Sequence, residues 1–310
     1  MKNLKRNYGH GKSLKYAAKH ALNFFFGDRF STVVNHSARF NLFADYCQKL
    51  KTNNAVYITQ ELFEMYADKT QSRVIDGGIS VHYAHNLISS VNVVMFAFRR
   101  DKKIWLSPKA LFGLRCHVRQ IAPNMEMLAV RLACKKIKKD AGDDIALLIW
   151  LARSLGLRLR EAILIDAKKA LKQARTTGFV DIRRGTKGGR GKHVERLVDS
   201  NKRILFALKL AVIAQEKRNT FIPNDEKLIT FYRRIHRIAL PILKEFNMIK
   251  IHDLRASFAC DEYKSEIGLD APVISNNSVK KTAEVKGKLE KISKKLGHNR
   301  DYIIDSYCGS

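Results

Sequence analysis

Residues 143–165, DDIALLIWLARSLGLRLREAILI, are a strongly apolar stretch in the middle of the chain. Their pattern predicts a helix that begins at Asp143 and breaks near Gly156, since glycine inside an apolar run marks an interruption. Beyond the break, Arg158 and Glu161 stand three residues apart and so share one helix face. An arginine beside a carboxylate on an apolar helix is usually a surface ion pair, so this motif alone indicates little about function.

Two further motifs follow toward the C-terminus. The sequence IHDLRASFA places His252 and Arg255 three residues apart, where both side chains can address one anion. The sequence KKLGHNRDYIIDSY contains His298 and, nine residues later, Tyr307. Each motif is common by itself, and the first is equally typical of a solvated helix start. Their order along the chain is more informative than either motif alone.

Between these motifs the pattern changes from helix to a short β element. Residues 179–182 predict a strand, GTKGGRGK a glycine-rich turn, and 193–198 a returning strand. The turn carries Lys187, Arg190 and Lys192. It does not match a phosphate-binding P-loop, because a histidine stands where that motif has Ser or Thr and a strand rather than a helix follows.

The first third of the chain has helical patterning. One helix is predicted after Ser37, which is a plausible cap, and two more near 59–68 and over roughly 80–98. The stretch that follows contains two prolines, a glycine and several basic residues, which is typical of a linker. The patterns together predict a mainly α fold with one small β element.

The order GLRLRE, TKGGRGK, HDLR, LGH and then Tyr307 resembles the signature of tyrosine recombinases, the phage-integrase family. The resemblance covers the C-terminal half, and the N-terminal helices also look like that family's core-binding domain. It implies a two-domain architecture. We place a helical DNA core-binding domain at 1–105, a linker at 106–124 and a catalytic domain at 125–310.

This resemblance implies that a tyrosine oxygen attacks a DNA phosphodiester and expels a 5′-hydroxyl. Such a transition state places charge on the non-bridging oxygens, so catalysis is mainly positioning and electrostatics. Arginine suits this task because its planar fork binds two oxygens and keeps its charge. The expected catalytic residues are Arg158, Lys187, His252, Arg255, His298 and the nucleophile Tyr307.

The resemblance also implies finer roles. Lys187 matches the family's catalytic lysine and would protonate the leaving 5′-oxygen, although an ordinary phosphate contact is the alternative. Arg190 and Lys192, in the same turn, are expected to contact DNA. His252 is implied as the base that takes the phenolic proton of Tyr307.

Glu161 is expected to hold Arg158 in place rather than to act as an acid or base. No metal is implied, because the carboxylates do not cluster at ligand spacing and the arginines supply the positive charge that a metal would provide. No other cofactor is needed, since a covalent intermediate conserves the bond energy.

The formal net charge of +29 points to a polyanionic partner. So large a charge costs self-repulsion in the folded state unless a polyanion offsets it. Nucleic acid is favoured, because each Lys or Arg placed on a phosphate releases condensed counterions; a merely soluble basic protein is the alternative. A membrane surface is disfavoured, since the charge is spread along the chain rather than gathered on one amphipathic helix.

Other features of the sequence bear on the compartment. The five cysteines are scattered and form no CxxC pair, which argues against a disulfide framework or zinc site. No apolar run approaches the roughly 20 residues of a membrane span, and the basic N-terminus lacks the apolar stretch of a signal peptide. We therefore expect a cytoplasmic, nucleoid-associated protein.

The resulting hypothesis is a site-specific recombinase or integrase of a mobile genetic element that works through a covalent 3′-phosphotyrosine. Its implied partners are double-stranded DNA, three further copies in a synaptic homotetramer and accessory DNA-bending proteins. Two alternatives remain open. A type IB-like topoisomerase would use the same residues, and a non-catalytic DNA-binding regulator could retain the same fold.

The chain departs from the family between Arg255 and His298, which lie 43 residues apart, a longer gap than is usual there. We call residues 268–288 the insert. Many relatives continue past the tyrosine with a helix that docks on a neighbouring subunit, whereas here three residues follow it. We expect the insert to dock on a neighbour instead, through the apolar residues Ala271, Val273 and Ile274; a flexible basic loop that contacts only DNA phosphate is the alternative.

Overall fold

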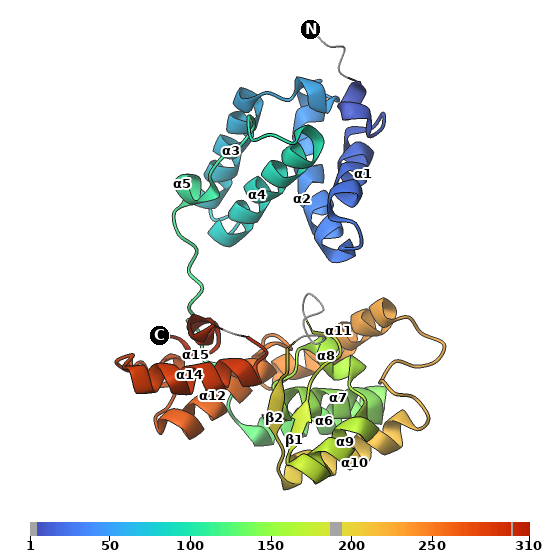
Figure 1. The fold of residues 1–310 in the computed structure, drawn as a ribbon, viewed down its shortest axis with the longest axis vertical. Helices are drawn as coiled ribbons and strands as arrows, with labels where there is room; N and C mark the ends of the chain where they lie inside the picture. Colours follow the sequence, from blue (N-terminus) through green and yellow to red (C-terminus); the bar gives the residue numbers. More distant parts are fainter. Residues whose placement is uncertain (1–4, 187–193, 299) are drawn as a thin grey trace. The chain divides into compact units, whose positions relative to one another are not determined.

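The computed structural model describes residues 5–186, 194–298 and 300–310. It divides into two compact units, Met1–Cys116 and His117–Ser310. Figure 1 shows the first as a bundle of helices and the second as helices packed with a small two-stranded sheet. The prediction of a mainly α fold with a small β element is confirmed. None of the helices in the described ranges is long and apolar enough to cross a membrane.

In its described residues the first unit packs five α-helices around an aromatic core. Its interior includes Phe40, Phe43 and Phe63, which are fully buried. The rings of Phe43 and Tyr66 pack edge to face, with their centroids 5.0 Å apart. The helices are α1 (Leu14–Phe26), α2 (Phe30–Lys49), α3 (Gln60–Ile75), α4 (Val81–Arg99) and α5 (Pro108–Phe112).

Two predicted features of this unit differ in the structure. Ser37 does not cap a helix: α2 begins at Phe30 and carries Ser37 on its buried face, because the apolar pattern continues upstream through Val33. In the expected linker, Pro108 starts α5 after Ser107, whose hydroxyl caps it. Helix α5 packs on α3 and α4, so the first unit extends beyond residue 105.

The second unit is built around α7 (Asp143–Ser154), the helix predicted from the apolar stretch. It contacts α6, α8, α10 and α12, and residues on several of its faces are buried. The strands pair antiparallel, with Val180 opposite Val198. The other elements are α6 (Met127–Ala141), α8 (Leu159–Leu164), α9 (Ala167–Thr177), β1 (Phe179–Asp181), β2 (Leu197–Asp199), α10 (Lys202–Gln215), α11 (Leu228–Glu245), α12 (Asp253–Ile267), α13 (Pro272–Ser275), α14 (Ala283–Lys295) and α15 (Asp305–Cys308).

The insert folds back on its own unit. Ala271 is fully buried, and Val273 and Ile274 are half-buried against the core of the second unit. The three residues therefore do not form the free apolar patch that we expected to dock on a neighbour. Apolar side chains next to a core lower the free energy of the folded chain by packing on that core, whereas exposed in solution they would stay in contact with water.

Candidate active site

The break at Gly156 shapes the start of the site. Gly156 has φ +59°, a left-handed conformation that glycine adopts without strain. A Cβ atom at this position would lie 2.3 Å from the ring of Phe258. The turn ends α7 and places Arg158 at the N-cap of α8. It also leaves the Gly156 carbonyl free to accept hydrogen bonds from side chains of other elements.

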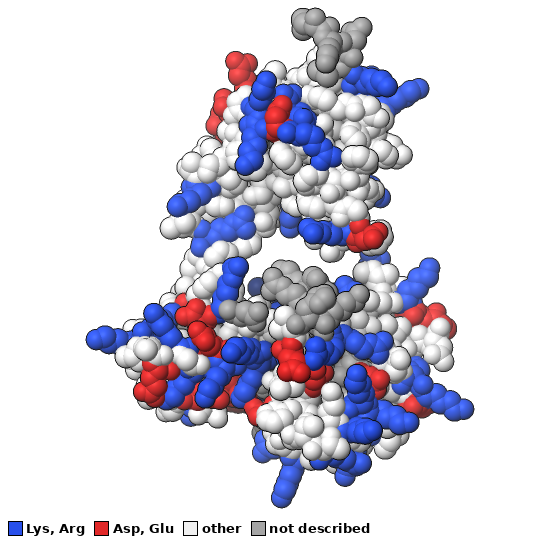
Figure 2. All heavy atoms as spheres, viewed as in Figure 1, with Lys and Arg blue, Asp and Glu red and all other residues white. Residues whose placement is uncertain are grey.

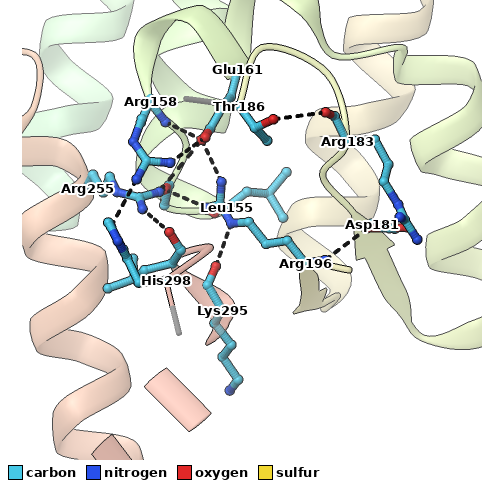
Figure 3. A network of polar contacts seen from close by, with 12 residues as sticks. Leu155, Arg158, Glu161, Asp181, Arg183, Thr186, Arg196, Arg255, Lys295 and His298 are labelled. Atoms are coloured by element: carbon cyan, nitrogen blue, oxygen red, sulfur yellow. Dashed lines mark hydrogen bonds and ion pairs between the residues drawn. The ribbon is translucent and has the colours of Figure 1, made fainter. Parts of the chain in front are cut away.

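Glu161 is the centre of the cluster. Its carboxylate is fully buried on the first turn of α8 and accepts from the Arg158 backbone N at 2.8 Å and from Arg158 Nη1 at 2.6 Å. Arg196 Nη1 donates to its Oε2 at 2.5 Å. Figure 3 shows these side chains converging on the carboxylate from separate elements.

Sequence reasoning missed Arg196. This residue is buried, and its guanidinium donates to the carbonyls of Lys295 at 2.7 Å and Gly156 at 2.9 Å. Burial lowers the pKa of Arg196. The available signal was period-two alternation: Arg196 stands two residues before Val198 and so points to the same, inward face.

Arg255, on α12, is fully buried and also well bonded. Nη1 donates to the Gly156 carbonyl, Nη2 to the Leu296 carbonyl, and Nε to Tyr307 Oη at 3.1 Å. Burial, followed by the positive charge of Arg196, lowers the pKa of Arg255 to about 9. We expected this arginine to present its fork to a phosphate, but in this structure the protein itself surrounds it.

The charges in this cluster compensate one another. Burial alone would raise the pKa of Glu161, but the positive charges outweigh that cost and lower its pKa to about 2. The cations responsible are, in order of effect, Arg196, Arg255 and Arg158. One carboxylate thus stays ionised and balances part of the charge of two buried guanidinium groups and of the partly exposed Arg158.

His298 and Tyr307 complete the cluster. Arg158 Nη2 lies 2.9 Å from His298 Nε2, and because arginine can only donate, this nitrogen is the acceptor. The same nitrogen lies 3.3 Å from Tyr307 Oη. The Tyr307 side chain is buried, at 4% exposure, so its hydroxyl sits between Arg255 and His298 rather than in solvent.

His252 lies beside this group and is exposed to solvent. Its ring centroid is 5.5 Å from that of Tyr307, and no hydrogen bond joins the two rings in the described part of the chain. Protein packed around the ring, together with the positive charges of Arg255 and Arg158, lowers the pKa of His252 to about 4. The imidazole is therefore neutral near pH 7 and able to accept a proton.

The structure thus brings six of the predicted residues into one cluster, and Lys187, Arg190 and Lys192 lie outside the described residues. Just before them, Gly185 presses against α8: a Cβ there would lie 2.6 Å from the Arg160 carbonyl oxygen. The described ranges contain no group of three or more His, Cys, Asp or Glu residues that could hold a metal ion. The clustered residues are Arg158, Glu161, His252, Arg255, His298 and Tyr307.

Comparison with known proteins shows what this chain is similar to. Residues 113–261 match the family model described as Integrase. A crystal structure of a lambda integrase dimer bound to a COC' core site is 14% identical, with a TM-score of 0.57 over 95% of this chain and 77% of that one. In this match and in its fold, the chain resembles the tyrosine recombinase family. No curated protein sequence matches it.

Other solved structures share the fold of this chain. A lambda integrase tetramer bound to a Holliday junction is 14% identical, with a TM-score of 0.58 over 94% of this chain and 74% of that one. Lambda integrase bound to DNA in a third structure is 13% identical, with a TM-score of 0.51 over 82% of this chain and 87% of that one. At these identities the likeness concerns the fold.

Replacing Gly156 by Ala is expected to lower the free energy of unfolding of the second unit by about 3 kcal/mol, from the left-handed backbone and the overlap with Phe258. Urea unfolding followed by Trp150 fluorescence in a Trp105→Phe background measures it, since the chain has two tryptophans. Gly268→Ala is the control: φ is +85° there, but nothing lies within 4 Å. Equal losses in the two variants would contradict the packing argument.

Glu161→Gln should lower the free energy of unfolding by about 3–5 kcal/mol near pH 7, because it leaves buried cations unpaired. The folded-state pKa of Glu161 lies below its reference value of 4.5. Its stabilising effect is therefore complete above about pH 5 and is lost as the pH falls toward about 2.

The difference in unfolding free energy between the wild type and Glu161→Gln should accordingly shrink over that range of pH. Glu290→Gln, which removes an exposed carboxylate on α14, serves as the control and should leave the pH profile in place. A wild-type to Glu161→Gln difference that stays constant down to pH 2 would show that the charge of Glu161 is not what stabilises the cluster.

Proposed function

We propose that the chain is a site-specific DNA recombinase that cuts and rejoins DNA through a covalent 3′-phosphotyrosine, in the integration or excision of a mobile genetic element. Tyr307 is the proposed nucleophile. The observation that carries the proposal is the position of its hydroxyl, 3.1 Å from Arg255 Nε and 3.3 Å from His298 Nε2. A buried phenol in contact with a cation and an imidazole is suited to phosphoryl transfer.

In the proposed reaction, Tyr307 Oη forms a bond to phosphorus and the bond from phosphorus to the 5′-oxygen breaks. The phenolic proton goes to a base, and the leaving oxygen takes up a proton to become a 5′-hydroxyl. Rejoining runs the same steps in reverse, with a 5′-hydroxyl as the attacking group. The phosphotyrosine bond retains the energy of the broken phosphodiester, so no cofactor is required.

His252 is the proposed base. Its lowered pKa, about 4, keeps the imidazole neutral, and its ring lies next to that of Tyr307. His298 is closer to the phenolic oxygen, but its Nε2 already accepts from Arg158 Nη2. We therefore assign His298 to positioning and to hydrogen bonding with the phosphate.

The arginines are proposed to stabilise the charge of the transition state. Arg158 is the more accessible, with 21% of its side chain exposed, whereas Arg255 is fully buried beneath the tyrosine. An incoming phosphate can thus meet Arg158 first, while Arg255 Nε already donates to the nucleophilic oxygen. Glu161 is proposed to hold both in place.

The roles of three residues rest on the motif alone. Lys187 is proposed as the acid that protonates the leaving 5′-oxygen, and Arg190 and Lys192 as DNA contacts. All three follow Gly185 in the sequence and lie outside the described residues.

The proposed partner is double-stranded DNA. Lys and Arg outnumber Asp and Glu by 58 to 29, and Figure 2 shows them spread over the visible face of both units. The similar lambda integrase structures contain a core site and, as a tetramer, a Holliday junction. By analogy we propose a homotetramer for the synaptic complex of this chain, with accessory DNA-bending proteins, at the nucleoid in the cytoplasm.

Tyr307→Phe is expected to abolish covalent attachment to DNA and to leave DNA affinity unchanged, because it removes only the attacking oxygen. The measurement is a denaturing gel with a labelled suicide substrate that traps the cleaved state. Tyr302→Phe, five residues earlier and exposed, is the matched control and should still form the adduct. A protein–DNA adduct that survives in Tyr307→Phe would rule out this nucleophile.

Arg158→Ala should slow adduct formation by about 10²- to 10³-fold, the cost of losing one donor to a transition-state oxygen. DNA affinity should fall by less than about tenfold, because one phosphate contact is lost among many. Arg160→Ala removes an equal charge from an exposed position on the same short helix. If Arg160→Ala slows cleavage as much as Arg158→Ala, the role of Arg158 is only that of general basic surface.

A further inference from the structure

The helix that bears Tyr307 needs support from outside itself. Helix α15 comprises only four residues, Asp305–Cys308, and so short a helix has no stability of its own. A nucleophile must nonetheless stay within a fraction of an ångström of its productive position. The contacts that α15 makes with the rest of the second unit therefore decide where the phenolic oxygen lies.

An ion pair holds the start of α15. Lys281 Nζ, from the insert, lies 3.0 Å from each carboxylate oxygen of Asp305, two residues before Tyr307. The two side chains are 40% and 20% exposed. On another side of the same residue, the backbone N of Arg119 donates to the Asp305 carbonyl at 2.9 Å.

The insert also contacts the end of α15. Gly309, two residues after Tyr307, packs so closely on Val273 that a Cβ at Gly309 would lie 2.8 Å from the Val273 backbone N. Insert residues Pro272 and Lys281 line one small cavity together with residues from both ends of α15. The insert therefore contacts the chain both before and after Tyr307, at Asp305 and at Gly309.

We propose that the insert is a positioning element for the nucleophile, in which the Lys281–Asp305 pair keeps Tyr307 beside Arg255 and His298 of its own chain. Lys281 and Asp305 are positioning residues, since neither touches the reacting atoms. The inference rests on the proposed function, because it assigns a role to the contacts around the proposed nucleophile. In this proposal the insert packs against α15 of its own chain, and not against a neighbouring subunit.

The expected size of the effect follows from the exposure of the pair. Partly exposed ion pairs contribute up to about 1 kcal/mol, which corresponds to about a fivefold change in rate. Lys281→Met should therefore slow cleavage about fivefold. Lys281→Glu places two carboxylates together and should slow it by about tenfold or more. Lys281→Arg keeps the charge and should stay within about twofold of the wild type.

The test measures two quantities for the full chain: the single-turnover rate of adduct formation at saturating suicide substrate, and the Kd for the same DNA. Lys280→Glu is the matched control. It makes the same change of charge one residue away, at an exposed position with no ion pair among the described residues. The melting temperature of each variant reports whether a loss of rate reflects unfolding.

If the insert positions the nucleophile, Lys281→Glu forms the adduct more slowly than the wild type at saturating DNA, and Lys280→Glu does not. The two variants change the Kd for DNA by the same amount. The positioning role further predicts that the exchanged pair, Lys281→Glu with Asp305→Lys, recovers at least half of the lost rate, on a logarithmic scale. A loop that only contacts DNA phosphate predicts equal losses of affinity in both variants, no change in rate at saturation and no recovery. That result would overturn the inference.

The outcomes also separate this inference from the proposed function. If the wild type forms no adduct, the proposed function fails. If the wild type forms an adduct and Lys281→Met, Lys281→Glu and the exchanged pair all cleave at the wild-type rate, the proposed function stands and the positioning role is wrong. If Lys281→Glu melts at a lower temperature than the wild type and Lys281→Met does not, the rate of adduct formation by Lys281→Met decides the question.

Discussion

The arrangement of the site depends on one buried carboxylate. Charges removed from water are tolerated only where they are paired and hydrogen-bonded, and here three guanidinium groups lie within 4 Å of one carboxylate. Glu161 accepts from Arg158 and Arg196 and lies 3.7 Å from Arg255 Nη1. It thereby ties α8, the residue that precedes β2, and α12 into one group, in positions that no single element could fix.

Backbone carbonyls also hold the arginines in position. Gly156 and Leu296 each accept from the Arg255 guanidinium, and Gly156 also accepts from Arg196. Fully bonded arginines lose little freedom when a ligand arrives, and preorganised donors cost no rearrangement at the moment of reaction. The same bonding makes Arg255 as much a structural residue as a chemical one, because a truncated side chain there would leave these carbonyls without a partner.

Tyr307, the proposed nucleophile, is held differently from the arginines. Tyr307 sits on a four-residue helix near the C-terminus, and its hydroxyl receives a hydrogen bond from Arg255. Its place is set from one side by the insert and Arg119, and from the other by the cluster itself. Tyr307 thus depends on contacts from separate segments of the second unit, whereas the arginines are held by hydrogen bonds within the cluster.

Local patterns in the sequence determined much of this protein: the helix from Asp143, the break at Gly156, the first short strand and the order of the motifs. These features follow from hydrophobic period and from backbone conformations that each residue favours by itself. The returning strand, expected over 193–198, instead runs over Leu197–Asp199. Only the tertiary structure decided that Arg196 joins Glu161, that Arg255 is enclosed, that Ser37 lies inside a helix and that Ala271 turns inward. Each of these depends on which surfaces meet across long stretches of chain, and burial of that kind is a property of the assembled core rather than of neighbouring residues.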